Sequence, residues 1–565
     1  MNKTNTNPNE PIDNLAIGKI IEVDGTHIIA ELNPNLFELS CIHAGEAYPI
    51  GQFGSMVKVH FGRRIIYALV GRLRMKSEFQ AERGMITNAS TDERVIEADL
   101  FGEGEWLYNS SNKRELEFER GVSSFPLPMQ NLYLTPKQEL RLIFGNKKDD
   151  VIQIGYHVGT GKSPCYANIN ELLGKHTAVL GSTGSGKSGT VAAIIHSILE
   201  KGSIDKYTKW KPRIIILDPH GEYGNAFKNH KILSSDDDSL LLPYWLLNLQ
   251  ETCSLLIGKT EYVATSQTNI VKKALILARE EGARIIGLDP KKINVDSPIP
   301  YKISTVQAKI EEDKPEQASK QDSHNSILRK LEIYKDDARY KFMMNEWSGE
   351  KDDPFPELIK LLIADDYQPR IIDLSGVPNE VAGIISSVIG RTLFSFKVWQ
   401  NQKERESDPL LLVCEEAHRY VPNRGEAQYE AAQEAIRRIA KEGRKYGLGL
   451  LLVSQRPSEV EATVLSQCNS WIVHRITNDA DREHVRLILP DSMSGMTKML
   501  SGLRKQEAIF VGQATMIPSR IMIRNLNTNQ LPKSNDIDFN TGWQNEIMPI
   551  GKISEVVNRW RYQQK

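Results

Sequence analysis

The chain has few cysteines, no charge excess and no long apolar run, and each of these absences excludes a class of protein. Five cysteines are scattered over 565 residues with no CxxC pair. This spacing excludes a disulfide framework and a cysteine-based zinc site, and it suits a reducing compartment. Lysine and arginine number 71 against 72 aspartates and glutamates, so no bulk positive charge marks a nucleic-acid binder. Any contact with nucleic acid would have to come from local patches.

Membrane and secretion signals are also lacking. No uninterrupted apolar run approaches the roughly 20 residues that span a bilayer. The first ten residues are polar, which is unlike a secretory leader. We therefore expect a soluble cytoplasmic protein with no membrane partner. A chain of this length is too long for one core, so two or three domains are expected.

A phosphate-binding loop is the most informative feature that is present. Residues 181–188 fit the pattern GxxxxGK[ST], between an apolar stretch readable as a strand (177–180) and one readable as a helix (189–199). In this pattern glycines let backbone amides wrap a polyphosphate, Lys187 neutralises the outer phosphates and the Ser188 hydroxyl joins a Mg²⁺ shell. We expect ATP to be held by Gly181, Ser182, Thr183, Gly184, Ser185, Gly186, Lys187, Ser188, Gly189 and Thr190.

The remaining pattern predicts an α/β fold with a mainly parallel sheet, a small N-terminal β-barrel and a helical insertion. Residues 1–156 are read as the β-rich region, with strands at 17–23, 27–32, 55–60, 65–70, 132–134 and 140–144. The nucleotide-binding core is read as 157–530, with strands at 177–180, 213–217, 369–374, 409–413, 448–453, 471–474 and 507–511. The helical insertion covers about 249–363. The tail, 531–565, ends in an amphipathic segment that packs on the core or on a neighbouring subunit.

Two adjacent carboxylates follow the strand at 409–413. Glu415 is predicted to orient the water shell of the metal, and Glu416 to polarise the attacking water. Aspartate is the usual residue at the first of these positions, so Glu415 departs from the pattern.

Asp218, at the end of another apolar strand, is a rival ligand for Mg²⁺. Asp218 and Glu222 flank a Pro-His-Gly turn, so structural turn roles stay open for both.

Two more segments are candidates for sensing the nucleotide. Gln455 follows the strand at 448–453 and could sense a water or the γ-phosphate. Arg444 ends a basic helix with Arg437 and Lys441 on the same face. Arg444 is predicted to be an arginine finger that acts on a neighbouring subunit; a solvated basic face is the alternative.

These motifs occur together as GSTGSGKS, DPHGEY, EEAHRYVP, EGRKYG and SQRP, after a strand-rich N-terminal segment. In this combination the chain resembles the HerA family of the FtsK–HerA group of P-loop ATPases, from Ile17 to Arg524. The resemblance implies a RecA-like ATPase core and an N-terminal barrel called the HAS domain. It also implies that Lys175 is a basic residue that can act in cis.

The resemblance further implies a homo-hexameric ring that uses ATP and Mg²⁺ to move double-stranded DNA, with a nuclease as partner. The resemblance to HerA-like rings of anti-phage systems implies a different class of function. Such a ring would be a scaffold that assembles and controls a nuclease or a sirtuin-like NADase effector. The near-neutral net charge favours this alternative slightly.

Overall fold

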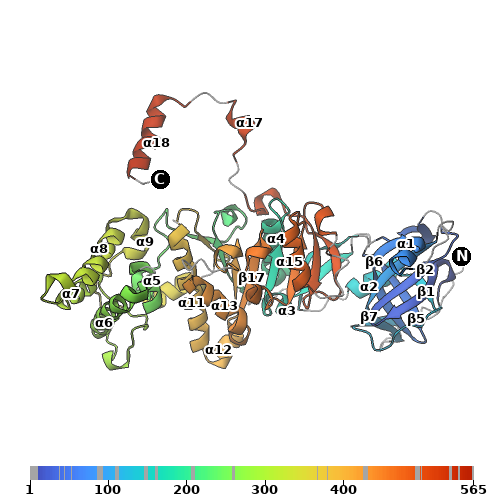
Figure 1. Cartoon of the computed structure of the whole chain (residues 1–565), viewed down its shortest axis with the longest axis horizontal. Coiled ribbons are helices and arrows are strands. Elements are labelled where there is room, and N and C mark those ends of the chain that lie inside the picture. Colours follow the sequence, from blue (N-terminus) through green and yellow to red (C-terminus); the bar gives the residue numbers. More distant parts are fainter. Residues whose placement is uncertain are drawn as a thin grey trace. The chain divides into compact units, whose positions relative to one another are not determined.

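The computed structural model (Figure 1) describes most of the chain. The described residues are 11–36, 39–43, 45–52, 54–84, 93–108, 114–145, 150–158, 163–204, 210–257, 261–364, 367–377, 379–423, 430–489, 497, 499–533, 537–544 and 548–562. The chain divides into two compact units. The first comprises Met1–Ile198, Gln455–Ser458 and Cys468–Asn525, and the second comprises Leu199–Ser454, Glu459–Gln467 and Leu526–Lys565.

The first unit begins with a closed antiparallel barrel, as predicted. Its strands are β1 (Ala16–Asp24), β2 (His27–Leu32), β5 (Met56–Phe61), β6 (Arg64–Met75), β7 (Arg94–Tyr108) and β9 (Asn131–Leu134). They pair in the order β2-β1-β9-β5-β6-β7, and a further β2–β7 pairing closes the barrel. β8 (Arg114–Arg120) adds to β7 outside the closed set. The alternating apolar residues of these strands fill the interior with aliphatic side chains.

One predicted strand of this region is wrong. Residues 140–144 lie in the helix α2 (Lys137–Gly145), where Leu140 and Ile143 are buried three residues apart. A short apolar run fits a strand and a buried helix equally well, and only the surrounding packing decides between them.

The rest of the first unit carries the phosphate loop. Its strands are β10 (Val151–His157), β11 (Pro164–Asn168), β12 (Thr177–Leu180), β18 (Ser470–His474), β19 (Glu507–Gly512) and β20 (Ser519–Ile523), in the order β11-β10-β20-β19-β18-β12. Only the β12–β18 pair is parallel among them. α4 (Lys187–Ile204) follows β12 directly after the loop.

The second unit holds a parallel sheet. Its strands are β13 (Arg213–Asp218), β14 (Lys231–Ser234), β15 (Arg370–Asp373), β16 (Leu410–Cys414) and β17 (Leu448–Ser454), in the order β17-β16-β13-β15-β14. Every pairing is parallel. The strands are almost uniformly buried, as expected where helices cover both faces of a parallel sheet. α11 (Asn379–Trp399) and α13 (Glu430–Glu442) pack against each other beside it.

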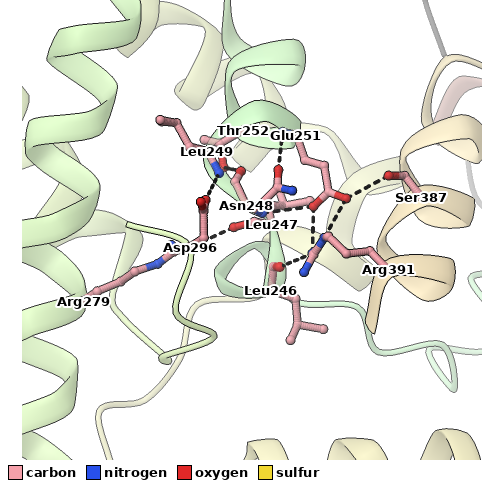
Figure 2. A network of polar contacts seen from close by, with 10 residues as sticks. All are labelled: Leu246, Leu247, Asn248, Leu249, Glu251, Thr252, Arg279, Asp296, Ser387 and Arg391. Atoms are coloured by element: carbon pink, nitrogen blue, oxygen red, sulfur yellow. Dashed lines mark hydrogen bonds and ion pairs between the residues drawn. The ribbon is translucent and has the colours of Figure 1, made fainter. Parts of the chain in front are cut away.

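The predicted insertion is helical. Between β14 and β15 the described residues form α5 (Leu249–Leu256), α6 (Glu261–Ile285), α7 (Ile303–Glu312), α8 (Asp322–Asp336), α9 (Lys341–Met344) and α10 (Phe355–Ile359), without a strand. These are the green and yellow helices in Figure 1. A polar network between α5 and α11 (Figure 2) joins the insertion to the helices of the sheet.

Two further helices bear on the sequence predictions. α11 is apolar and long enough over Val381–Trp399 to cross a membrane, but 67% of that window is buried inside the protein, as in a core helix. At the other extreme, α18 (Ile550–Tyr562) has no buried residue, and Trp560 on it is 79% exposed. The exposed apolar face of α18 is the amphipathic segment predicted for the tail.

Candidate active site

The phosphate loop adopts a conformation that requires its glycines. Gly181, Gly184 and Gly186 have φ values of 155°, 71° and 113°, a region that other residues rarely adopt. A Cβ on Gly181 would lie 2.6 Å from the Cβ of His474, whereas a Cβ on Gly184 would meet no atom within 4 Å. The loop is therefore packed against β18 at Gly181 and open at Gly184. An open backbone of this kind can approach a phosphate closely.

The first turn of α4 is held by a histidine that the sequence analysis did not single out. His474, at the end of β18, is fully buried; its Nδ1 lies 2.9 Å from the carbonyl oxygen of Glu507 and its Nε2 2.8 Å from Thr190 Oγ1. Burial, reinforced by the charge of Lys187, lowers the pKa of His474 to about 4. The neutral ring therefore donates from Nδ1 to Glu507 and accepts from the Thr190 hydroxyl at Nε2.

Several predicted loop residues have defined partners. The ammonium of Lys187 donates to the carbonyl oxygen of Ser182 at 3.2 Å. Ser182 Oγ accepts from the backbone N–H of Thr477 at 3.2 Å. Thr183 Oγ1 donates to Gln455 Oε1 at 2.5 Å. The structure thus places Gln455 at the phosphate loop, 272 residues away in sequence.

Lys175 lies just before β12, and its ammonium is engaged by neighbours. Its Nζ is 2.6 Å from Glu171 Oε2 and 2.9 Å from Gln513 Oε1. To act on a nucleotide in cis, Lys175 would have to leave these two partners.

The second unit carries the two carboxylates predicted for catalysis. Glu415 and Glu416 follow β16 and are 6% and 9% exposed. The buried phenol of Tyr223 donates to Glu415 Oε1. Burial, together with the negative charge of Glu415, raises the pKa of Tyr223 well above its ordinary value, so the phenol keeps its proton. Tyr223 lies within the DPHGEY motif but was not predicted as a site residue.

Asp218, the rival metal ligand, ends β13 beside the same tyrosine. Its Oδ2 accepts from the backbone N–H of Tyr223 at 2.9 Å, and its Oδ1 accepts from that of His220 at 3.2 Å. Burial raises the pKa of Asp218, and these backbone donors oppose the shift. Both carboxylate oxygens therefore shape the Pro-His-Gly turn. This arrangement favours the structural role that the sequence analysis left open.

Two imidazoles flank Glu416. His220 Nε2 is 3.9 Å from Glu416 Oε1, and His418 Nδ1 is 3.4 Å from Glu416 Oε2. Neither histidine was predicted as a site residue. His418 is part of the EEAHRYVP motif, so a polar residue two positions after the carboxylate was the available signal.

Two arginines of the basic segment have different surroundings. Arg437 Nε is bound to Glu461 Oε2 at 2.6 Å. Arg444 lies beyond α13, in the short helical turn Gly443–Tyr446, and is exposed. The turn is fixed by Tyr446, whose ring packs edge-on against Phe394 at 5.5 Å between centroids. Arg444 is thus presented to solvent by a firmly held segment.

The residues present fit a magnesium ion that is bound largely through the nucleotide. Among the described residues, no group of three or more His, Cys, Asp or Glu side chains could hold a metal by itself. Mg²⁺ in nucleotide sites needs only one or two protein ligands besides phosphates and waters. Each unit carries one side chain with an oxygen of the preferred type, Ser188 in the first unit and Glu415 in the second.

Comparison with known proteins finds similarity to helicases. The family model "Helicase HerA, central domain" matches residues 152–393. A probable helicase of Methanocaldococcus jannaschii is 28% identical over 81% of this chain and 86% of its own length. A DNA double-strand break repair helicase HerA of Pyrococcus furiosus is 25% identical over 71% of this chain and 74% of its own length.

Among solved structures, VirB4 of Thermoanaerobacter pseudethanolicus aligns with a TM-score of 0.47 and 15% identity, over 68% of this chain and 99% of that one. Over residues 152–393 the chain is similar to the central domain of HerA helicases, and relatives named as helicases resemble it at 25–28% identity.

Proposed function

We propose that this protein is a motor that uses ATP hydrolysis to move double-stranded DNA. The observation that carries the proposal is the phosphate loop, with its three positive-φ glycines, the buried Lys187 and the Gln455 contact at Thr183. The two relatives described above, 28% and 25% identical to this chain, are both named as helicases. DNA movement is inferred from that kinship.

We assign the catalytic roles as follows. Lys187 and the loop amides bind the phosphates, and Gln455 senses the γ-phosphate. Glu416 polarises the attacking water. Glu415 and Ser188 would hold Mg²⁺, which when bound neutralises phosphate charge. Asp218 remains the secondary candidate for the metal.

The assembly is proposed to be a homo-hexameric ring. Arg444 is exposed on its own subunit, as a residue must be to reach the site of the next subunit. In a ring of this kind each site would be completed by a neighbour. Affinity for DNA would come from phosphate contacts, which are independent of base sequence.

The predicted domain plan is retained as part of the proposal. Residues 1–156 would be the HAS-type barrel region, 157–530 the ATPase core and 531–565 a tail that docks on the neighbouring subunit. The exposed apolar face of α18 supports docking outside its own unit. The ring would work in the cytoplasm with an effector, either a nuclease or an NADase-type enzyme.

The decisive experiment measures ATP hydrolysis with and without duplex DNA. Hydrolysis should be stimulated by duplex DNA and abolished by Lys187→Ala. Lys228→Ala, which changes an exposed lysine of the second unit, is the matched control and should behave as wild type. A DNA-independent ATPase without translocation would contradict the motor. If that ATPase also formed a stable complex with a co-expressed effector whose activity needs the ring, the anti-phage scaffold would replace the motor.

A further inference from the structure

Glu416 is held in a strained backbone conformation. Its φ and ψ are both 52°, in the left-handed region. A residue with a side chain is found there only when its surroundings hold it in place. The carboxylate is buried, and its Oε2 accepts no hydrogen bond from the described part of the chain. The direction in which this carboxylate points therefore depends on the groups beside it.

His418 is the better placed of the two imidazoles beside Glu416. Its Nδ1 lies 3.4 Å from Oε2, against 3.9 Å between His220 Nε2 and Oε1. The side chain of His418 is 15% exposed and that of His220 is 43% exposed. The position of His418 is therefore more fixed than that of His220, and water competes less with its imidazole for contact with the carboxylate.

The same nitrogen of His418 has a second polar neighbour. Ser454 Oγ, at the end of β17, lies 3.3 Å from His418 Nδ1 and is itself buried. An imidazole Nδ1 carries at most one hydrogen. With two oxygen acceptors within 3.4 Å, that hydrogen can be directed to Glu416 or to Ser454. The residue after Ser454 is Gln455, the predicted nucleotide sensor.

We propose that His418 is a positioning residue for Glu416. The Nδ1 atom lies 3.4 Å from Glu416 Oε2, outside hydrogen-bond geometry, and a small rotation of the ring would direct its N–H to that oxygen and hold the carboxylate in the direction that activates water. Turning the hydrogen toward Ser454 releases the carboxylate. This inference rests on the proposed role of Glu416 in hydrolysis. His418 does not itself touch the reacting atoms.

The expected consequence is a change in turnover without a change in nucleotide binding. A displacement of about 1 Å in a reacting group can reduce the rate by roughly 100-fold, because the reactive geometry is lost. The phosphate loop, which binds the nucleotide, does not include His418. Removal of His418 should therefore lower kcat by about 10- to 100-fold and leave KM for ATP unchanged.

The test compares three substitutions of His418. An asparagine amide reaches the position of Nδ1, whereas a glutamine amide reaches that of Nε2. We expect His418→Asn to retain most of kcat, and His418→Gln and His418→Ala to lose it at unchanged KM and unchanged affinity for a non-hydrolysable ATP analogue. His230→Asn is the control, because the hydrogen bond of His230 is with the backbone carbonyl of Phe227. Melting curves identify any variant that fails to fold. If His418→Ala does not fold, the comparison of kcat between His418→Asn and His418→Gln tests the proposal.

Two results would overturn the proposal. Full activity of His418→Ala would show that His418 does not position Glu416. An equal loss of kcat in His418→Asn and His418→Ala would show that His418 only fills space. Glu416→Gln is measured in parallel. If Glu416→Gln hydrolyses ATP normally, the assignment of the catalytic carboxylate fails and this inference fails with it. If Glu416→Gln is inactive while His418→Ala is active, only the inference about His418 fails.

Discussion

The buried Glu251 and the partly exposed Arg391 form a bidentate ion pair between the helical insertion and the core of the second unit. Arg391 Nε donates to Glu251 Oε1 at 3.0 Å, and Arg391 Nη2 donates to Oε2 at 2.8 Å. Ser387 Oγ also donates to Oε1, at 2.8 Å, and the backbone N–H of Asn248 donates to Oε2 at 3.0 Å (Figure 2). The carboxylate is 1% exposed, so its charge depends on these donors. The insertion is thus attached to α11 at a specific point.

Removing one partner of this pair should be costly. We expect Arg391→Ala to destabilise the protein by about 3–5 kcal/mol, because the buried Glu251 charge would lose its partner. Chemical denaturation, monitored by circular dichroism, measures the change. The control is Lys273→Ala, which breaks the Lys273–Asp313 pair, where the lysine side chain is 71% exposed, and should cost less than about 1 kcal/mol. Equal effects of the two variants would contradict the importance of burial.

His474 should make the first unit sensitive to acid. Histidine has an ordinary pKa of 6.5, and burial lowers that of His474 to about 4. The unfolded chain therefore binds a proton at this residue before the folded one does. The neutral ring of His474 should contribute about 3 kcal/mol to the free energy of unfolding above pH 6.5. This contribution should be lost as the pH falls toward 4.

The measurement is the denaturation midpoint as a function of pH. Wild type should lose stability between pH 6.5 and pH 4 more steeply than His474→Gln, which has no titrating group at this position. His157 has a pKa lowered to about 3 by burial, and it remains in both proteins, so it does not affect the comparison. An NMR titration in which the ring of His474 protonates near pH 6.5 would refute the prediction.

The phenol of Tyr223 should matter for turnover. Tyr223→Phe removes the hydroxyl that donates to Glu415, and a hydrogen bond to a charged group is worth about 1.5–3 kcal/mol. We expect kcat to fall roughly tenfold or more, while affinity for an ATP analogue stays the same. Tyr420→Phe is a matched control, because the buried Tyr420 hydroxyl has no hydrogen-bond partner within the described residues. That variant should be as active as wild type and at least as stable. If both variants keep full activity, the Tyr223 contact has no part in catalysis.

A site shared between subunits can be tested by mixing inactive variants. Arg444→Ala and Lys187→Ala should each be inactive alone, because one removes the proposed finger and the other the phosphate-binding lysine. Co-expression of the two variants should restore part of the ATPase activity. Some interfaces in the mixed ring would pair an intact phosphate loop with an intact Arg444 from the next subunit.

The control mixture is Lys187→Ala with Glu416→Gln. Both changes fall on the same side of the proposed shared site, so no interface would be intact and activity should stay absent. If Arg444→Ala alone keeps full activity, Arg444 belongs to a solvated basic face. If Arg444→Ala is inactive and its mixture with Lys187→Ala stays inactive as well, Arg444 does not act on the neighbouring subunit.

Much of the fold was predictable because its signals are local. The strands at 177–180 and 448–453 correspond to β12 and β17, since a continuous apolar run bounded by polar residues is typical of a buried parallel strand. The barrel followed from alternating runs separated by turn residues such as Gly62, which has a φ of 63° between β5 and β6. The helix over 137–145 was missed because a five-residue apolar run carries too little periodicity.

Two of the functional residues that were missed, Tyr223 and His474, contact partners far away in the chain. Tyr223 reaches Glu415 across 192 residues, and His474 reaches Thr190 across 284. A single tyrosine or histidine in a sequence is most often a core residue, so nothing near it in the chain could mark these contacts. Gln455 was predicted because the strand before it is recognisable and strand ends are a common location for site residues.

The sequence by itself predicted the chemistry of this protein: a loop for a triphosphate, carboxylates at the end of a strand, and a resemblance to a family of ATPases. Short motifs suffice for this because the spacing of glycines, lysine and serine is set by the backbone of one turn. Only the tertiary structure decided which groups hold those motifs in place. The strained Glu416 next to His418, the neutral His474 behind the loop, and the Glu251–Arg391 joint all depend on contacts between distant segments, which form only when the chain is packed.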